Sequence, residues 1–177
     1  MENVSIDFSF NGFSIKSQMN TNRQKLKCYH QLRDFVTNQK EKNQLSFLTS
    51  LTGNDYRKDY SNLMLDWSEI RKLSKHNLIT IGAHTHTHPN LKILSKAEVE
   101  SEMKESKHLL EEKLGFSIKH FAYPFGKVSN YGLREIDLLI DLGYKTAVGT
   151  HFNPINFSEL KTNYFSLPRL AGFQHGS

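Results

Sequence analysis

The sequence predicts an α/β fold in which a mostly parallel sheet is flanked by helices and preceded by a hairpin and two further helices. Three observations predict this class. After residue 65, segments with apolar residues at helical spacing alternate with short apolar runs, which is typical of parallel sheets covered by helices. Before residue 22, apolar and polar residues alternate on both sides of Asn11-Gly12, which indicates a two-residue hairpin turn. Between these regions the apolar period is helical.

The N-terminal region is predicted to hold one hairpin and two helices. A helix is expected over residues 22–38, and a second over Leu45–Leu51 ends at Gly53, a residue type that favours the backbone of a helix C-terminus. Cys28 lies at helical spacing among apolar residues, so we expect a buried thiol rather than a nucleophile. The strands alternate through Val4, Ile6, Phe8, Phe10, Phe13 and Ile15.

The later elements follow each other as helix and strand. Three helices are expected. The first is short and carries Trp67, Ile70 and Leu73, and the other two end at Gly115 and at Gly143. Their starts carry capping residues, namely Asp66 with Glu69, Ser95 with Glu98, and residue 129 or 130. The apolar, β-branched runs between them predict buried strands at Leu78–Ala83, Ile118–Tyr123, Tyr144–Gly149 and Phe165–Ala171.

Composition narrows the class of protein. With 177 residues, 37% of them hydrophobic, the chain has the size and composition of one globular domain. No run reaches the about 18 apolar residues of a membrane-spanning helix, and the first 20 residues do not form a signal peptide. A single cysteine excludes an internal disulfide. The net charge of +5 is spread without a basic stripe, so we expect no nucleic-acid partner.

Three unusual segments follow the ends of the predicted strands. They are His84–Pro89, Pro124–Gly126 and His151. Because parallel α/β folds bind ligands beyond the carboxyl ends of their strands, we expect these segments to form one site.

The histidine segment predicts a divalent-metal site, because neutral imidazole is the commonest metal ligand in proteins. A helical turn would place His84 and His88 on one face, whereas an extended segment would also align His86 with them. Several metal families use close histidines. A metallo-β-lactamase pattern and the His-Glu-x-x-His pattern do not fit these residues. An amidohydrolase-like site stays open, and it would draw further ligands from residues such as His151 or Asp137.

Two motifs resemble the NodB-type polysaccharide deacetylase family, carbohydrate esterase family 4. His84-Thr85-His86-Thr87-His88 is similar to its His-[Ser/Thr]-x-x-His motif, and Phe121–Gly126 is similar to its Pro-[Tyr/Phe]-Gly turn. The resemblance covers about residues 62–171, so residues 62–177 are expected to be the C-terminal part of a deacetylase domain. Residues 1–61, with the hairpin and helices, resemble an insertion. The resemblance implies a partial (β/α) barrel of the deacetylase type with outer helices.

The resemblance also implies roles for individual residues. His84 and His88 would be metal ligands, with zinc expected first and cobalt or nickel as alternatives, while His86 would be a bystander. The backbone N–H of Phe125 would face the oxyanion formed during hydrolysis of an acetyl group on a polysaccharide or oligosaccharide. Arg169 would orient the catalytic carboxylate. Thr85 would brace the histidine loop, and the groove for the sugar would be shaped by Tyr123 and Pro124.

The family's carboxylates have no counterpart in this sequence. Neither its Thr-Phe-Asp-Asp motif, which supplies a metal ligand and the catalytic base, nor its Leu-x-His motif occurs. Two histidines leave a catalytic zinc one protein ligand short of three. We therefore expect an incomplete metal-dependent hydrolase, with a homo-oligomer or a complementing chain as its candidate partners. The alternative is a non-catalytic remnant that binds sugar or metal only.

Overall fold

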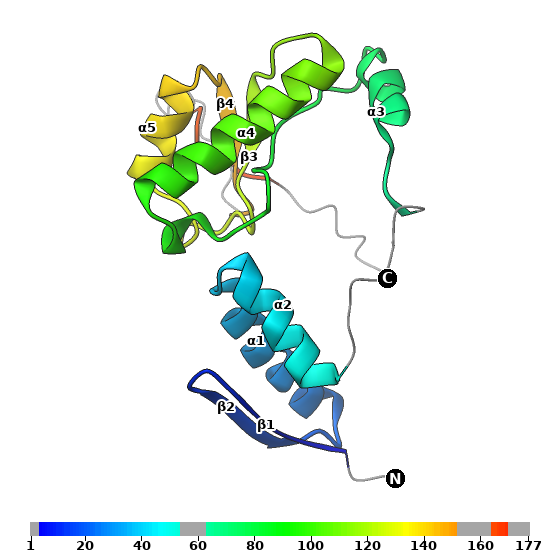
Figure 1. Cartoon of the computed structure of the whole chain (residues 1–177), viewed down its shortest axis with the longest axis vertical. Coiled ribbons are helices and arrows are strands. Elements are labelled where there is room, and N and C mark those ends of the chain that lie inside the picture. Colours follow the sequence, from blue (N-terminus) through cyan, green and yellow to red (C-terminus); the bar gives the residue numbers. More distant parts are fainter. Residues whose placement is uncertain (1–3, 54–62, 152–163, 170–177) are drawn as a thin grey trace, which may run out of the picture. The chain divides into compact units, whose positions relative to one another are not determined.

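The structure is a computed structural model that describes residues 4–53, 63–151 and 164–169. The chain divides into two compact units, Met1–Tyr60 and Ser61–Ser177, which are treated separately below (Figure 1). The predicted loop at residues 54–61 and the last two residues of the predicted strand Phe165–Ala171 lie outside the described residues. None of the described helices is long and apolar enough to cross a membrane.

The first unit begins with the predicted hairpin. Strands β1 (Ser5–Phe10) and β2 (Phe13–Gln18) pair antiparallel, with Phe10 opposite Phe13. The two turn residues have φ angles of 45° at Asn11 and 82° at Gly12. Both values are positive, which is the backbone of a type I′ turn and fits the right-handed twist of paired strands. The hairpin prediction is confirmed.

Two helices follow the hairpin and share a core with it. They are α1 (Asn22–Thr37) and α2 (Glu41–Thr52), and α2 ends at the left-handed Gly53 as predicted. Phe47 of α2 is 1% exposed and contacts four other phenylalanine rings: Phe8, Phe10, Phe13 and Phe35. Cys28 of α1 is also buried, and burial raises the pKa of its thiol, so the prediction of a structural cysteine is confirmed.

The second unit alternates helix and strand in the predicted order. Its elements are α3 (Trp67–Ser74), the 3₁₀ turn η2 (Leu91–Ile93), α4 (Lys96–Leu114), β3 (His120–Ala122), α5 (Leu133–Asp141) and β4 (Thr146–Val148). The capping boxes predicted at Asp66 and Ser95 are both formed, because each side chain accepts a hydrogen bond from the backbone three residues later. The third helix starts later than predicted, with Gly132 as its N-cap.

The sheet of this unit is parallel and short. Strands β3 and β4 pair in parallel, Ala83 bridges Phe121 on one side, and Leu167 bridges Val148 on the other. The strands predicted at Leu78–Ala83 and Phe165–Ala171 are thus reduced to single bridges in the described residues. The first was also expected to be buried, and this is wrong at its start, because Leu78 is 85% exposed and Ile79 is 37% exposed. The described residues form a mixed α/β unit without a closed barrel, so the partial barrel stays a prediction.

The two faces of this sheet differ. One face packs on α4 and α5, where Phe121 is 2% exposed and Ala147 is fully buried (Figure 1). The neighbouring residues of each strand point to the opposite face, because side chains alternate along a strand. That opposite face lines a pocket of about 490 Å³. The lining residues are Thr80, Gly82, Ala83, His84, His120, Phe121, Ala122, Thr146 and Val148.

Two tyrosines in this core predict how the fold responds to alkali. Burial raises the pKa of Tyr144 to about 12 and raises that of Tyr123 as well. Because the folded state holds these phenols protonated, its stability is constant below the unfolded pKa of about 10 and is lost as the pH rises above it. For Tyr144 the loss should be about 1.4 kcal/mol per pH unit up to pH 12.

Urea unfolding between pH 9 and pH 12 measures this loss. The variant Tyr144→Phe is the matched control, because it removes the titrating hydroxyl and keeps the ring against Phe121 and Lys107. We expect a shallower decline of the unfolding free energy in the variant. Equal slopes for the two proteins would show that Tyr144 titrates normally.

Candidate functional site

The histidine loop starts where Ala83 leaves the sheet. Within it, Thr85 has a φ of 64° and His88 a φ of 59°. Positive φ is rare for residues with a Cβ, and it is least tolerated by β-branched residues such as threonine. Such strained conformations persist only where the surrounding structure holds them, and they concentrate at functional sites. The loop is thus neither the helical turn nor the extended segment considered above.

Hydrogen bonds hold the loop in this shape. The hydroxyl of Thr85 donates to the carbonyl of His84 at 2.5 Å and accepts the backbone N–H of His88 at 3.1 Å. The carboxylate of Glu102, on α4, accepts three more hydrogen bonds from the middle of the loop. The first and last histidines are therefore tied together through the threonine between them, in line with the bracing role expected of Thr85.

His84 and His88 come together at the ends of this loop. Their ring centroids are 4.7 Å apart, at an interplanar angle of 70°. Nδ1 of His84 lies 2.7 Å from the carbonyl oxygen of Ala122, an acceptor, so Nδ1 carries the proton and Nε2 presents a lone pair. Metal-binding histidines are commonly oriented by such a bond from their second nitrogen to a backbone carbonyl.

The charge state of His88 also suits a ligand. Partial burial and then the neighbouring charge of His84 lower the pKa of His88 below its ordinary value. A lower pKa keeps the imidazole neutral over a wider pH range, and the neutral ring is the form that binds metals.

The Phe125 turn forms the second part of the site. Phe125 has a φ of 60°, and its ring centroid lies 4.9 Å from that of His88. The turn is anchored to the end of β4, because Thr150 donates its hydroxyl to the Phe125 carbonyl at 2.8 Å and its N–H to the Gly126 carbonyl at 2.7 Å. This places a strained backbone directly beside the imidazole pair.

Tyr123 and Pro124 lie beneath this turn rather than on its surface. Both side chains are buried, and the ring of Tyr123 stacks on Tyr131 at 3.7 Å. The hydroxyl of Tyr123 donates to the carbonyl of Phe165 at 2.9 Å. In this structure the two residues can shape a groove only by supporting the backbone of the turn.

The remaining predicted residues lie at the end of β4. Nε of Arg169 donates to the carbonyl of Gly149 at 2.8 Å. The hydroxyl of Tyr131 lies 3.3 Å from Nδ1 of His151 and 2.8 Å from the hydroxyl of Ser166. Among the described residues, Arg169 has no ion pair with a carboxylate. Its expected role in orienting a catalytic acid stays a prediction.

The donor set of the site fits a divalent ion in part. Two adjacent imidazoles, one with a defined free nitrogen, match the nitrogen ligands of zinc. However, no group of three or more histidine, cysteine, aspartate or glutamate side chains in the described parts of the chain is placed to hold a metal. The pair would supply two ligands, and a third would have to come from outside the described residues.

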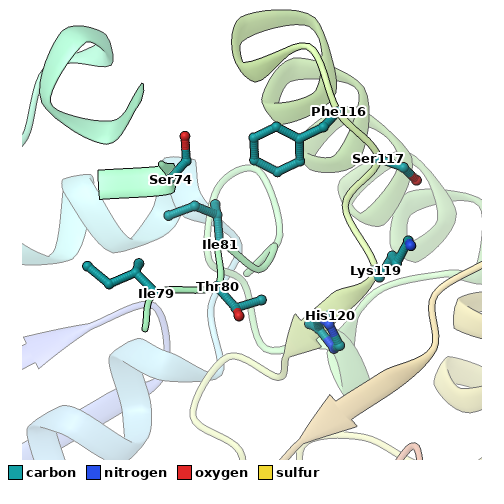
Figure 2. Close-up of a pocket in the computed structure, with 8 residues that line it drawn as sticks. All are labelled: Ser74, Ile79, Thr80, Ile81, Phe116, Ser117, Lys119 and His120. Atoms are coloured by element: carbon teal, nitrogen blue, oxygen red, sulfur yellow. The ribbon is translucent and has the colours of Figure 1, made fainter. Parts of the chain in front are cut away.

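Two pockets mark the two ends of the sheet. The pocket that includes His84 reaches the carboxyl end, where the histidine loop begins. A second pocket, of about 330 Å³, lies among residues that precede the paired segments, including Ile79, Ile81 and Phe116 (Figure 2). Since the segments run in parallel, this second pocket lies at the opposite end of the strands. Of the imidazole pair and the Phe125 turn, only His84 lines the first pocket.

The fold defines an α/β protein with two adjacent imidazoles at the end of a strand, and sequence comparison shows the family. Residues 27–147 match the family described as polysaccharide deacetylase, which is more than half of the chain. The chain therefore belongs to the polysaccharide deacetylase family, as its motifs predict. The match starts within α1, so the assignment of residues 1–61 as an insertion stays a prediction. No curated protein sequence matches the chain significantly.

Solved structures of deacetylases share the fold. The deacetylase PplD of Streptococcus pyogenes, in complex with acetate, is 25% identical with a TM-score of 0.53, over 60% of this chain and 44% of that one. A polysaccharide deacetylase from Bacillus cereus is 17% identical with a TM-score of 0.52, over 84% and 43%. The BpsB deacetylase domain of Bordetella bronchiseptica is 14% identical with a TM-score of 0.52, over 60% and 48%. The chain spans less than half the length of each.

Sequence reasoning missed the contact between Glu102 and the histidine loop. The residue lies three positions after Val99 and one before Met103, both of which face the core. An acidic residue at the edge of the buried face of a helix was the available signal, because such a group needs a partner. Its partner is 15 and 16 residues away in sequence, and no local pattern reports that distance.

Proposed function

We propose that this chain carries the histidine half of the metal site of a hydrolase that removes N- or O-acetyl groups from a polysaccharide. In this proposal His84 and His88 bind one divalent ion, with zinc first and cobalt or nickel as alternatives. The catalytic base and the third ligand come from a carboxylate outside the described residues. Membership of the deacetylase family supports the substrate class.

The observation that carries the proposal is the pair of adjacent imidazoles beside a strained turn. Three of the four residues other than glycine with positive φ in the described structure are Thr85, His88 and Phe125. They belong to two segments 37 residues apart (125 − 88), and the rings of His88 and Phe125 are in contact. A loop and a turn that only connected secondary structure would not need this strain in both places.

Each residue of the pair and the turn has a defined task in the proposed reaction. A bound divalent ion would supply Lewis acidity, which lowers the pKa of water and polarises the acetyl carbonyl. His84 presents Nε2 because Ala122 holds its Nδ1 proton. The backbone N–H of Phe125, fixed by the turn, donates to the developing oxyanion. Tyr123 and Pro124 support the turn that borders the sugar, and Arg169 stands at the end of the next strand.

The alternative is a non-catalytic remnant that binds sugar or metal and hydrolyses no substrate. The observation that favours it is that, in the part of the chain that the structure describes, no carboxylate joins the pair to form a group of three possible metal ligands. Both proposals require an intact imidazole pair. They differ in whether acetate is ever released.

Acetate release from acetylated chitooligosaccharide tests the proposal. We expect no release by this chain alone, since no described acid or base is placed to activate water. Release should appear when the chain is combined with a segment of a family member that carries Thr-Phe-Asp-Asp, and it should require added zinc or cobalt. The variant His88→Ala is the control and should abolish this release. Metal binding by the pair with no release in any combination would favour the remnant.

A further inference from the structure

We propose that Glu102 is a positioning residue, which aligns the two imidazoles by fixing the backbone of the loop between them. This inference rests on the proposed function, in which the pair binds a metal ion. Glu102 lies on α4 and does not contact either imidazole ring. From α4 it accepts hydrogen bonds from the loop between the two histidines.

The contacts of Glu102 are directed at the centre of the loop. Its Oε2 accepts the backbone N–H groups of His86 and Thr87, both at 2.8 Å. Its Oε1 accepts the hydroxyl of Thr87 at 2.6 Å. Hydrogen bonds to an ionised carboxylate are about twice as strong as those between neutral groups. The Glu102 carboxylate thus holds the peptide N–H groups of His86 and Thr87 and also the Thr87 hydroxyl.

The position of these contacts explains their effect on the pair. His86 and Thr87 lie between the two left-handed residues, Thr85 and His88. A left-handed conformation is unfavourable above all for the β-branched Thr85, so the loop relaxes unless something outside it holds the intervening backbone. Relaxation at Thr85 would also release the N–H of His88, which the Thr85 hydroxyl accepts. Glu102 is therefore placed to set the separation of the two rings.

The helix that carries Glu102 is a rigid support. Val99 and Met103, on either side of it, are fully buried, and the helix is capped by Ser95. In the described residues Glu102 has no salt bridge with a lysine, arginine or histidine side chain, so its carboxylate is committed to the loop. A group held by a packed helix transmits little of its own motion to the residues that it orients.

Three variants of the full chain separate positioning from general stability. Glu102→Ala removes all three acceptors. Glu102→Gln keeps an oxygen for the two N–H groups, and its amide can donate to the Thr87 hydroxyl. Glu100→Ala is the matched control, because it removes an exposed carboxylate from the same helix. The first readout is the Zn²⁺ affinity measured by calorimetry. The second is the nuclear magnetic resonance signal of the His84 Nδ1 proton in the metal-free protein.

We expect Glu102→Ala to weaken Zn²⁺ binding by about 10–100-fold, as is usual when the support of a ligand is removed. Glu102→Gln should stay within about 3-fold of the wild type because it preserves the acceptor geometry. Glu100→Ala should not differ from the wild type. The His84 Nδ1 proton signal should be lost or broadened only in Glu102→Ala. The melting temperatures of Glu102→Ala and Glu100→Ala should be the same.

An unchanged affinity and an unchanged His84 signal in Glu102→Ala would overturn the inference. So would an equal loss in Glu102→Gln and Glu102→Ala, which would show that charge and not geometry matters. A wild-type chain that binds no zinc would count against the proposed function instead. In that case the His84 signal still decides whether Glu102 positions the loop. If Glu102→Ala does not fold, Glu102→Asp takes its place, because the shorter side chain keeps the charge but withdraws the carboxylate from the loop. A Zn²⁺ affinity and a His84 signal equal to those of Glu100→Ala would then overturn the inference.

Discussion

Replacing His88 by alanine should remove the high-affinity binding of zinc to this chain, and replacing His84 should do the same. Each imidazole supplies one of only two described ligands, which lie with their ring centroids 4.7 Å apart. The loss should exceed the about 10–100-fold cost of altering a residue that only supports a ligand. Titration calorimetry with Zn²⁺ at neutral pH measures it. Stability should change little, because both side chains are exposed.

His86 provides the control for this prediction. It belongs to the same loop, is equally exposed, and engages Glu102 through its backbone N–H, which an alanine retains. His86→Ala should therefore bind zinc like the wild type. If His86→Ala lost zinc binding while His84→Ala kept it, the assignment of the ligands would be wrong.

Replacing Phe121 by alanine should destabilise the second unit by about 3–5 kcal/mol, the usual cost of deleting a phenylalanine ring from a core. Phe121 is the centre of the helix-facing side of the sheet and is 2% exposed. Its ring contacts those of Tyr123 and Tyr144 at centroid distances of 5.4 and 5.5 Å. A typical domain is stable by about 5–15 kcal/mol, so the variant should be close to unfolding at 37 °C. Urea denaturation followed by tyrosine fluorescence measures the change.

The matched control is Phe116→Ala, in the same unit. Phe116 is 42% exposed and lines the pocket at the opposite end of the strands (Figure 2). Its removal should change the free energy of unfolding by less than about 1 kcal/mol. A similar loss in both variants would mean that the apolar face of the sheet is not the principal core of this unit.

Local signals in the sequence predicted the boundaries of several elements. Asn11-Gly12 predicted the hairpin because only a turn with two positive φ angles fits two twisted strands at that spacing. The capping residues Asp66 and Ser95 predicted where helices begin, since each satisfies backbone N–H groups that have no partner within the helix. These features depend on contacts within about four residues. The sequence therefore contains all the information they require.

Features that depend on distant contacts were not predictable in the same way. The run at Leu78–Ala83 has the composition of a buried strand, yet only Ala83 pairs among the described residues and Leu78 is 85% exposed. Tyr123 was expected at the sugar groove and is fully buried, because Tyr131 stacks on it from eight residues away. The hydrogen bonds from Glu102 to the histidine loop are also contacts between residues that are distant in the sequence.

The candidate site was predicted at the level of its residue types. Metal-ligand chemistry pointed to the histidine segment as a whole, and the resemblance to the deacetylase motifs pointed to His84, His88 and the turn at Phe125. The structure brings these three side chains together. The shape of the loop was not predictable. It depends on two left-handed residues that propensity disfavours and that the tertiary structure holds in place.

The most direct test of the central claim is a zinc titration that observes the imidazole nitrogens of all histidines by nuclear magnetic resonance. We expect one equivalent of zinc, bound through Nε2 of His84 and through a ring nitrogen of His88. The Nδ1 proton of His84 should stay on the Ala122 carbonyl throughout, and the signals of His86 and His151 should not move. Zinc bound through His86 or His151, or with the Nδ1 of His84, would contradict it.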